Sequence, residues 1–249
     1  MTAPFDYYRE YWSEDDVAPE GRLLPKLERL LGETIPSGAQ VLDLGCGDGR
    51  AVGPFLVGRG CSYVGADISE NALARAQGLG LTTQLIHDAG DLPWPDGEFG
   101  AVVCFEVLEH LFDPRAAVRE ALRVLAPGGL MIATVPNVAY WARRVELALL
   151  GRWNPMGDTE SVERPWRDPH IRFFTTGALR RMFLDAGFNH VTVGGHSGAA
   201  LAHLPIVRTL TRSAWKPEAS RLYRAFESRW PSLFGYGLYA VARKPGAGR

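Results

Sequence analysis

The chain has 249 residues, 46% of them hydrophobic and 22% charged, which is typical of a globular protein with a sizeable core. A formal net charge of −1 argues against general electrostatic binding of nucleic acid, so we do not expect a nucleic-acid partner. No apolar run reaches the roughly 20 residues that span a bilayer, and the N-terminus is too polar for a signal peptide, so we expect a cytoplasmic protein without a membrane span.

The first strand of the chain runs into a glycine-lined turn at Val41–Arg50. Its apolar residues are typical of a strand covered on both faces, and Gly45, Gly47 and Gly49 permit positive φ and a close approach of a ligand to the backbone. Helical spacing resumes near Ala51, so we expect the amides of a helix N-terminus to face this turn. The turn predicts a nucleotide-like ligand, although its alternating glycines depart from the dinucleotide fingerprint.

Strand and helix patterns alternate through the middle of the chain. After the first strand, apolar runs predict strands at residues 63–66, 83–87, 101–105 and 130–135, with helical spacing between most of them. Such alternation indicates an α/β fold, in which a mostly parallel sheet has helices on both faces. Ligands of such sheets bind beyond the carboxyl ends of the strands, where the winding direction reverses. The residues directly after each strand are therefore the candidate site residues.

The regularity loosens beyond the fifth strand. A helical pattern at residues 140–150 is followed by a loop rich in Gly, Pro, Trp and charge, which suits a lid over a substrate. A helix at 176–186 and a strand at 190–193 come next, followed by an irregular insertion at 198–232 and a last strand at 236–243. We expect a single domain over residues 1–249, divided into an N-terminal helical cap at 1–37, a ligand-binding core at 38–136, a lid at 137–175 and a C-terminal half at 176–249.

Acidic residues accompany the first three strands. Asp43 lies two positions before the first glycine of the turn, and Asp67 ends the second strand, where a carboxylate can accept hydrogen bonds from both hydroxyls of a ribose. The pattern D-x-G-x-G-x-G at Asp43–Gly49 resembles motif I of the class I S-adenosylmethionine (SAM) methyltransferases. The run D-A-G-D-L-P-W-P-D, which begins at Asp88, resembles a second motif of that family.

This resemblance covers residues 38–136 and implies a Rossmann-like class I methyltransferase with a seven-stranded, mostly parallel sheet and SAM as cofactor. The carbonyl of Gly45 would take the ammonium group of SAM, and the Asp88–Ala89 pair contacts the adenine in the resembling family. Trp94 and Gly100 replace the usual Phe and Asp, but neither position binds the cofactor. The cofactor-binding residues that the resemblance implies are Asp43, Gly45, Cys46, Gly47, Asp67, Ile68, Asp88, Ala89 and Phe105.

Candidate metal ligands follow the fourth strand. If a helix starts there, Glu106, Glu109 and His110 stand at i, i+3 and i+4 and project from one face. His170 lies far along the chain, at the end of the lid. Two carboxylates and two imidazoles can hold a divalent cation with positions left open for substrate oxygens. Alternatively, the acids are solvated residues at a helix start, and His170 anchors the loop.

The E-x-x-E-H run at Glu106–His110 and the H-x-R-F-F-T block at His170–Thr175 resemble the metal site of the small-RNA 3′-end 2′-O-methyltransferases. Ubiquinone-biosynthesis O-methyltransferases share a similar E-x-x-E-H run and methylate one of two adjacent hydroxyls. The resemblance implies a metal site of Glu106, Glu109, His110 and His170, with His110, His170 and Glu109 as the catalytic residues. Oxygen ligands would favour Mg²⁺, whereas two imidazoles favour Mn²⁺, Co²⁺ or Zn²⁺, so the identity of the metal stays open.

We therefore expect a SAM-dependent, metal-dependent O-methyltransferase that acts on a vicinal diol of a sugar, oligosaccharide or related small molecule. Trp141, Trp153 and Trp166 of the lid suit sugar rings, and the H-x-R-F-F-T block also resembles bacterial methyltransferases encoded with glycan-modifying genes. A metal-independent O- or N-methyltransferase with His110 as general base stays open, as does a SAM-binding protein without catalysis. A homodimer contact through the insertion at 198–232 is also open.

Overall fold

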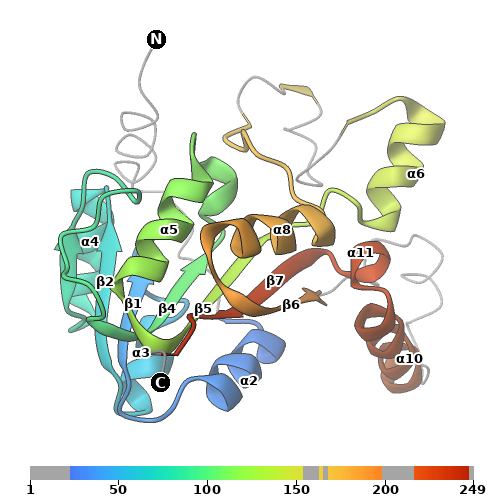
Figure 1. The fold of residues 1–249 in the computed structure, drawn as a ribbon. Helices are drawn as coiled ribbons and strands as arrows, with labels where there is room; N and C mark the ends of the chain where they lie inside the picture. Colours follow the sequence, from blue (N-terminus) through green and yellow to red (C-terminus); the bar gives the residue numbers. More distant parts are fainter. Residues whose placement is uncertain (1–22, 154–162, 165–167, 198–215, 247–249) are drawn as a thin grey trace.

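The computed structural model describes residues 23–153, 163–164, 168–197 and 216–246. Its strands form one seven-stranded sheet in the order β3-β2-β1-β4-β5-β7-β6 (Figure 1). The strands are β1 Gln40–Leu44, β2 Ser62–Asp67, β3 Thr83–Leu85, β4 Phe99–Phe105, β5 Leu125–Pro136, β6 Asn189–His196 and β7 Gly237–Arg243. Pairing is parallel from β3 to β5, and β7 runs antiparallel to both of its neighbours. The predicted mostly parallel, seven-stranded sheet is confirmed.

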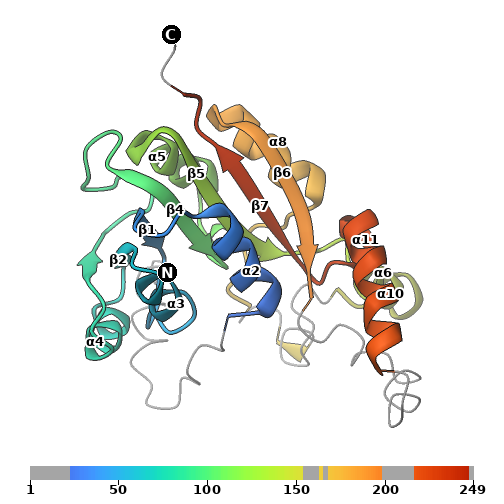
Figure 2. The same ribbon diagram turned by 90° about the horizontal axis from the view of Figure 1, so that it is seen from below.

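Helices cover both faces of this sheet (Figure 2). They are α2 Pro25–Thr34, α3 Gly53–Gly58, α4 Glu70–Gly78, α5 Pro114–Val124, α6 Trp141–Leu150, α8 Thr176–Ala186, α10 Lys216–Arg229 and α11 Pro231–Phe234, together with a 3-10 turn, η1, at Leu108–His110. Side chains of β1 alternate between two apolar clusters, because successive residues of a strand point to opposite faces. Leu42 packs in the cluster of α5 and α8, whereas Val41 packs in the cluster of α2 and α3.

The winding direction reverses at β1. The chain proceeds from β1 to β2 and β3 on one side, and then crosses to β4 on the other side. The carboxyl ends of β1 and β4 therefore flank the switch point, where open α/β sheets bind ligands. The glycine turn follows β1 and the E-x-x-E-H run follows β4, so the fold brings these two candidate sites together.

The prediction of an irregular segment at 198–232 is wrong for its second half. Residues 216–229 form α10, and α11 follows directly, while residues 198–215 lie outside the described residues. The basic and apolar composition of the segment concealed a regular helical pattern. No helix among the described residues has both the length and the apolar character needed to cross a membrane.

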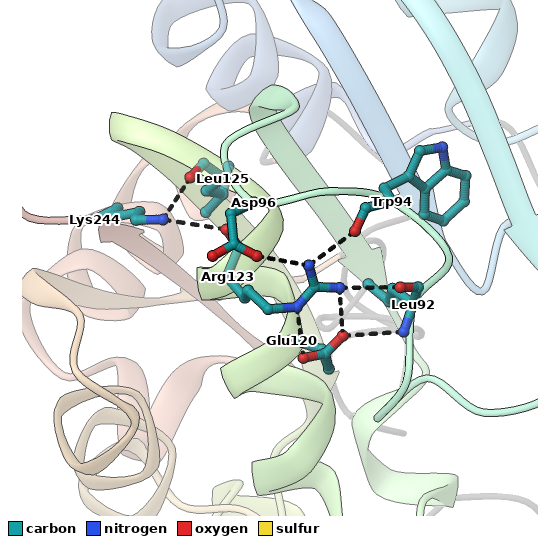
Figure 3. Close-up of polar contacts among 7 residues, drawn as sticks. All are labelled: Leu92, Trp94, Asp96, Glu120, Arg123, Leu125 and Lys244. Atoms are coloured by element: carbon teal, nitrogen blue, oxygen red, sulfur yellow. Dashed lines mark hydrogen bonds and ion pairs between the residues drawn. The ribbon is translucent and has the colours of Figure 1, made fainter.

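The L-P-W-P-D run is held by Arg123 at the end of α5 (Figure 3). The Arg123 guanidinium donates hydrogen bonds of 2.9 Å to the Leu92 carbonyl and 2.8 Å to the Trp94 carbonyl, and it forms ion pairs with Asp96 and Glu120. The run precedes β4 and so lies at the opposite edge of the sheet from the glycine turn. In this structure the run anchors the start of β4.

Candidate active site

The turn after β1 accepts only glycine at its first position. Gly45 has φ +76°, and a Cβ atom there would lie 2.3 Å from Cγ2 of Val107 in the segment after β4. The Gly45 and Cys46 amides both donate to the Ala66 carbonyl at the end of β2. The turn is therefore clamped between the ends of the two strands that flank β1.

Asp43 is a buried carboxyl group beneath this turn. Its Oδ2 accepts a 2.8 Å hydrogen bond from the Tyr63 hydroxyl of β2, the strand paired with β1. Burial raises the pKa of Asp43 to about 7, the Tyr63 hydrogen bond acts in the opposite direction, and the charge of Asp67 adds to the increase. The protein thus holds a carboxyl group that changes its charge near neutral pH directly behind the glycines.

Asp67 ties the end of β2 to the same turn. Its Oδ2 accepts a 2.9 Å hydrogen bond from the Gly47 amide, and its Oδ1 accepts one of 2.9 Å from the Ser69 amide. Burial raises the pKa of Asp67, and these amide hydrogen bonds partly offset the effect. Each carboxylate oxygen has two lone pairs, so the bonds leave acceptor capacity for a ribose diol.

The turn also contains a residue that the sequence analysis missed. Asp48 is buried, and its Oδ1 accepts a 3.0 Å hydrogen bond from the Arg50 amide, while its Oδ2 pairs with the Arg50 side chain. The Gly49 amide donates to the Cys46 carbonyl. The following helix, α3, begins at Gly53 and not near Ala51, because these contacts first complete the turn.

The remaining predicted cofactor residues lie at or just beyond the same strand ends. Asp88 is exposed after β3, and its Oδ1 accepts a 2.7 Å hydrogen bond from the Gly90 amide, while Ala89 beside it is buried. Ile68 follows β2, and Phe105 ends β4. The structure therefore gathers all the predicted cofactor residues along the carboxyl edge of β1 to β4.

Glu109, His110 and His170 meet beside this edge, although the two histidines are 60 positions apart in the sequence. Glu109 Oε1 lies 3.9 Å from His110 Nε2 and 3.8 Å from His170 Nε2. The centroids of the two imidazole rings are 4.4 Å apart. One ligand atom from each residue lies within 4.8 Å of the others, a spacing that fits a shared metal ion.

Both histidines are oriented through their other ring nitrogen. His170 Nδ1 lies 2.7 Å from Asp168 Oδ1, and His110 Nδ1 lies 3.3 Å from the Pro169 carbonyl. These acceptors favour the neutral tautomer with its proton on Nδ1, in which Nε2 is the atom that can bind a metal. Burial lowers the pKa of His110 to about 4, and His170 contributes in the same direction, so His110 is neutral at pH 7.

Glu109 is the acid of this cluster. It is fully buried, and neither carboxyl oxygen has a hydrogen-bond partner in good geometry, although its own backbone amide and the Glu106 carboxyl group lie close enough to influence its pKa. Burial, and then the charge of Glu106, raise the pKa of Glu109 well above its usual value. A buried carboxyl group without a donor is costly, and a cation between it and the two imidazoles would supply the missing partner.

Glu106 does not lie on a helix face with Glu109 and His110, so the predicted helical spacing is wrong. Its φ is +52°, and its amide donates to both oxygens of Thr134 on β5. The chain therefore bends sharply after β4, and only the short η1 turn follows. Glu106 is not one of the three residues whose ligand atoms lie within 4.8 Å of one another, but its carboxyl group stays beside that of Glu109. Burial raises the pKa of Glu106, and the charge of Glu106 adds to the rise in the pKa of Glu109.

The lid segment reaches the site through backbone contacts. The Ile171 and Arg172 amides each donate a 3.0 Å hydrogen bond to the Glu109 carbonyl, and this pairing brings His170 to Glu109. Asp168 was not among the predicted site residues, although a carboxylate two positions from a candidate ligand is a usable signal. Trp141 and Trp153 belong to the described part of the lid, whereas Trp166 lies outside it.

Comparisons with known proteins agree with this architecture. A family described as a methyltransferase domain matches residues 11–193. A ubiquinone biosynthesis O-methyltransferase from Idiomarina loihiensis is 30% identical over 168 residues, which cover 64% of this chain and 65% of that protein. A tRNA (carboxymethyluridine(34)-5-O)-methyltransferase from Arabidopsis thaliana is 36% identical over 159 residues, which cover 59% of this chain and 36% of that protein. The match spans less than two thirds of each relative's length.

Solved structures show the same fold. The phosphoethanolamine N-methyltransferase 2 of Haemonchus contortus, in complex with SAM, has a TM-score of 0.63 at 15% identity, covering 98% of this chain and 60% of that one. A SAM-dependent methyltransferase from Archaeoglobus fulgidus has a TM-score of 0.57 at 17% identity, covering 88% and 93%. Since the family match extends over most of the chain and the fold agrees, this protein belongs to the class I SAM-dependent methyltransferases.

Proposed function

We propose that this methyltransferase transfers the methyl group of SAM to one hydroxyl of a vicinal diol in a sugar, oligosaccharide or related small molecule. Glu109, His110 and His170 hold a divalent cation, and Glu106 beside them supplies a fourth ligand. The observation that carries the proposal is the buried Glu109 carboxyl group, which has no hydrogen-bond donor and faces two imidazole nitrogens. The similarity to an O-methyltransferase supports an oxygen acceptor.

The strand pairing supports a transfer between the two sites. β1 and β4 are parallel neighbours, so the turn that would bind SAM and the segment that carries Glu109 leave the sheet side by side. In the proposed site Asp43 and the Gly45 carbonyl face the ammonium group, Asp67 accepts the ribose hydroxyls, and Asp88 with Ala89 contacts the adenine. Holding donor and acceptor in line accounts for much of the rate enhancement in such reactions.

The acceptor hydroxyl requires activation, because it is a weak nucleophile at pH 7. A divalent cation, when bound, lowers the pKa of a hydroxyl coordinated to it. The protein itself excludes water from the Glu109 carboxyl group and places the Nε2 atoms of two histidines close to it. The two imidazoles beside the carboxylates favour Mn²⁺ over Mg²⁺, which prefers oxygen ligands. The low pKa of His110 makes it a weak general base and speaks against the metal-independent alternative.

Incubation with labelled SAM and a panel of sugars, polyols and catechols tests the proposal. We expect methyl transfer to acceptors with adjacent hydroxyls and none to their singly hydroxylated or fully methylated analogues. Transfer that is equally fast to isolated hydroxyls or to amines would contradict the diol assignment. If no acceptor yields product while SAM binds, the alternative of a non-catalytic SAM-binding protein is favoured.

Asp168 offers a direct test of the metal site. Asp168→Ala removes the acceptor that orients His170, so we expect the affinity for Mn²⁺ to fall about 10- to 100-fold. Asp168→Asn keeps an oxygen acceptor and should lose much less. Calorimetric titration of both variants with Mn²⁺ measures the effect, and equal affinity in the wild type and both variants would count against the assigned geometry.

The raised pKa of Asp43 predicts a pH dependence of cofactor binding. Asp43 is protonated in the folded protein below about pH 7 and ionised above it. Because the SAM ammonium group prefers the ionised carboxylate, SAM affinity should rise with pH through this value, by at most about tenfold per unit. For the same reason Asp43 lowers fold stability as pH rises from its unfolded pKa of about 4 through 7. Asp43→Asn should flatten the dependence of Kd on pH, and an unchanged profile in that variant would assign the titration to another group.

A further inference from the structure

Exposed aromatic side chains border the candidate metal site. Phe112 follows His110 by two positions and is 65% exposed, and Phe173 follows His170 by three positions and is 45% exposed. Trp153, which ends the described part of the segment after α6, is 43% exposed. We call Phe112, Trp153 and Phe173 the apolar rim.

The backbone holds the segments of the rim next to the site. The Arg172 guanidinium donates a 2.6 Å hydrogen bond to the Phe112 carbonyl and one of 2.9 Å to the Ile171 carbonyl. The positively charged guanidinium of Arg172 is therefore hydrogen-bonded to backbone carbonyl oxygens of both segments of the rim. The rings of Trp153 and Phe173 meet edge to face, with centroids 5.5 Å apart. Trp153 and Phe173 thus form one apolar contact, and the Arg172 hydrogen bond holds the backbone of Phe112 to the segment that carries Phe173.

Exposed apolar side chains also occur elsewhere. Val145, Leu147, Leu149 and Leu150 lie on α6, directly before Trp153, whereas Val57 belongs to α3 and Leu79 ends α4, at the end of the sheet away from α6 (Figure 1). Single exposed apolar residues of this kind are ordinary in soluble proteins, whereas connected exposed patches beside a site mark a contact surface. Ligand sites commonly combine a few polar groups with such apolar walls.

We propose that the acceptor is amphiphilic, with its hydroxyl-bearing head at Glu109, His110 and His170 and an alkyl or aromatic body against the apolar rim. The position of the head rests on the proposed function. The apolar body rests on the exposure of the rim and on its continuity with the site. The rim residues are then determinants of acceptor specificity, and a free sugar without an apolar substituent is a poor ligand.

Methyl and octyl β-glucopyranoside provide a matched pair of probes, because they carry the same diols and differ only in the apolar chain. We would measure their binding to the protein with S-adenosylhomocysteine present, keeping the octyl compound below its micelle concentration. Burial of several methylene groups predicts binding of the octyl compound at least about tenfold tighter. Phe173→Ser and Trp153→Ser should remove this preference, whereas Val57→Ser, an equally exposed apolar position elsewhere, should keep it. All three sites are exposed, so melting temperatures close to that of the wild type are expected and would confirm folding.

Equal affinity for the two glucosides, no detectable binding of the octyl compound, or a chain-length preference that survives in both rim variants would each overturn the proposal. The measurement is repeated after metal removal with EDTA. Because the rim contacts are apolar, the chain-length preference should persist without metal. If the protein still prefers the octyl glucoside but transfers methyl groups without metal, only the metal site of the proposed function is contradicted. If the protein loses this preference while methyl transfer still requires metal, only the role of the apolar rim is contradicted.

Discussion

Gly45→Ala is expected to abolish SAM binding and to destabilise the fold strongly. The backbone at Gly45 has φ +76°, a conformation that costs roughly 1–2 kcal/mol for a residue with a Cβ atom. The new methyl group would also lie 2.3 Å from Val107 Cγ2, so either the turn or the segment after β4 must move. Movement of either would displace the amides and carbonyls that form the cofactor site, and we expect SAM affinity to fall by at least about a hundredfold.

Gly38→Ala is the matched control. Gly38 has nearly the same φ, +77°, but nothing lies within 4 Å of a Cβ atom there. That variant should lose only the roughly 1–2 kcal/mol of stability that a positive φ costs a residue with a Cβ atom, and it should bind SAM normally. Thermal unfolding and calorimetric titration with SAM separate the two effects, and equal behaviour of the two variants would show that the contact with Val107 is unimportant.

Glu109→Gln is expected to stabilise the metal-free protein while removing metal binding. Burial and the charge of Glu106 disfavour the ionised Glu109 carboxyl group, whereas Gln carries no charge and its amide can donate to an imidazole Nε2 or to Glu106. Relief of an unsatisfied buried group is worth about 1–3 kcal/mol. For a protein of this size each kcal/mol raises Tm by roughly 2–4 °C. Residues of a ligand site often lower the free energy of unfolding of the protein without its ligand.

Added Mn²⁺ should raise the Tm of the wild type and leave that of Glu109→Gln unchanged, because a ligand stabilises only the state that binds it. Glu33→Gln, the same chemical change at an exposed position of α2, should resemble the wild type in both respects. A Glu109→Gln protein that is less stable than the wild type without metal would mean that the carboxyl group has a structural partner.

The fold and the cofactor edge were predictable because their signals are local. Apolar runs and the alternating glycines identify β1 and its turn within ten residues, and Asp67 stands at a fixed distance beyond them. Parallel pairing then places the ends of β1, β2 and β4 together without further information.

The geometry of the second site was less predictable because it depends on distant residues. Glu106 has a positive φ and not the helical conformation that its spacing predicted, because its amide donates hydrogen bonds to Thr134 of β5. No pattern in the sequence near Glu106 indicates that contact. In the same way, the role of the L-P-W-P-D run depends on Arg123 at the far end of α5. The proximity of Glu109 and His170 was expected from their ligand chemistry and from a resemblance, and no local pattern predicted it, since the hydrogen bonds that bring them together join separate segments of the chain.

Methyl transfer by the metal-depleted protein is the most direct test of the central claim. The enzyme would be treated exhaustively with EDTA, and its rate with an active diol acceptor measured before and after addition of Mn²⁺. We predict that depletion removes activity while SAM still binds, that Mn²⁺ restores the rate, and that Glu109→Gln is not rescued. Full activity of a protein shown to contain no bound metal would contradict a metal site at Glu109, His110 and His170.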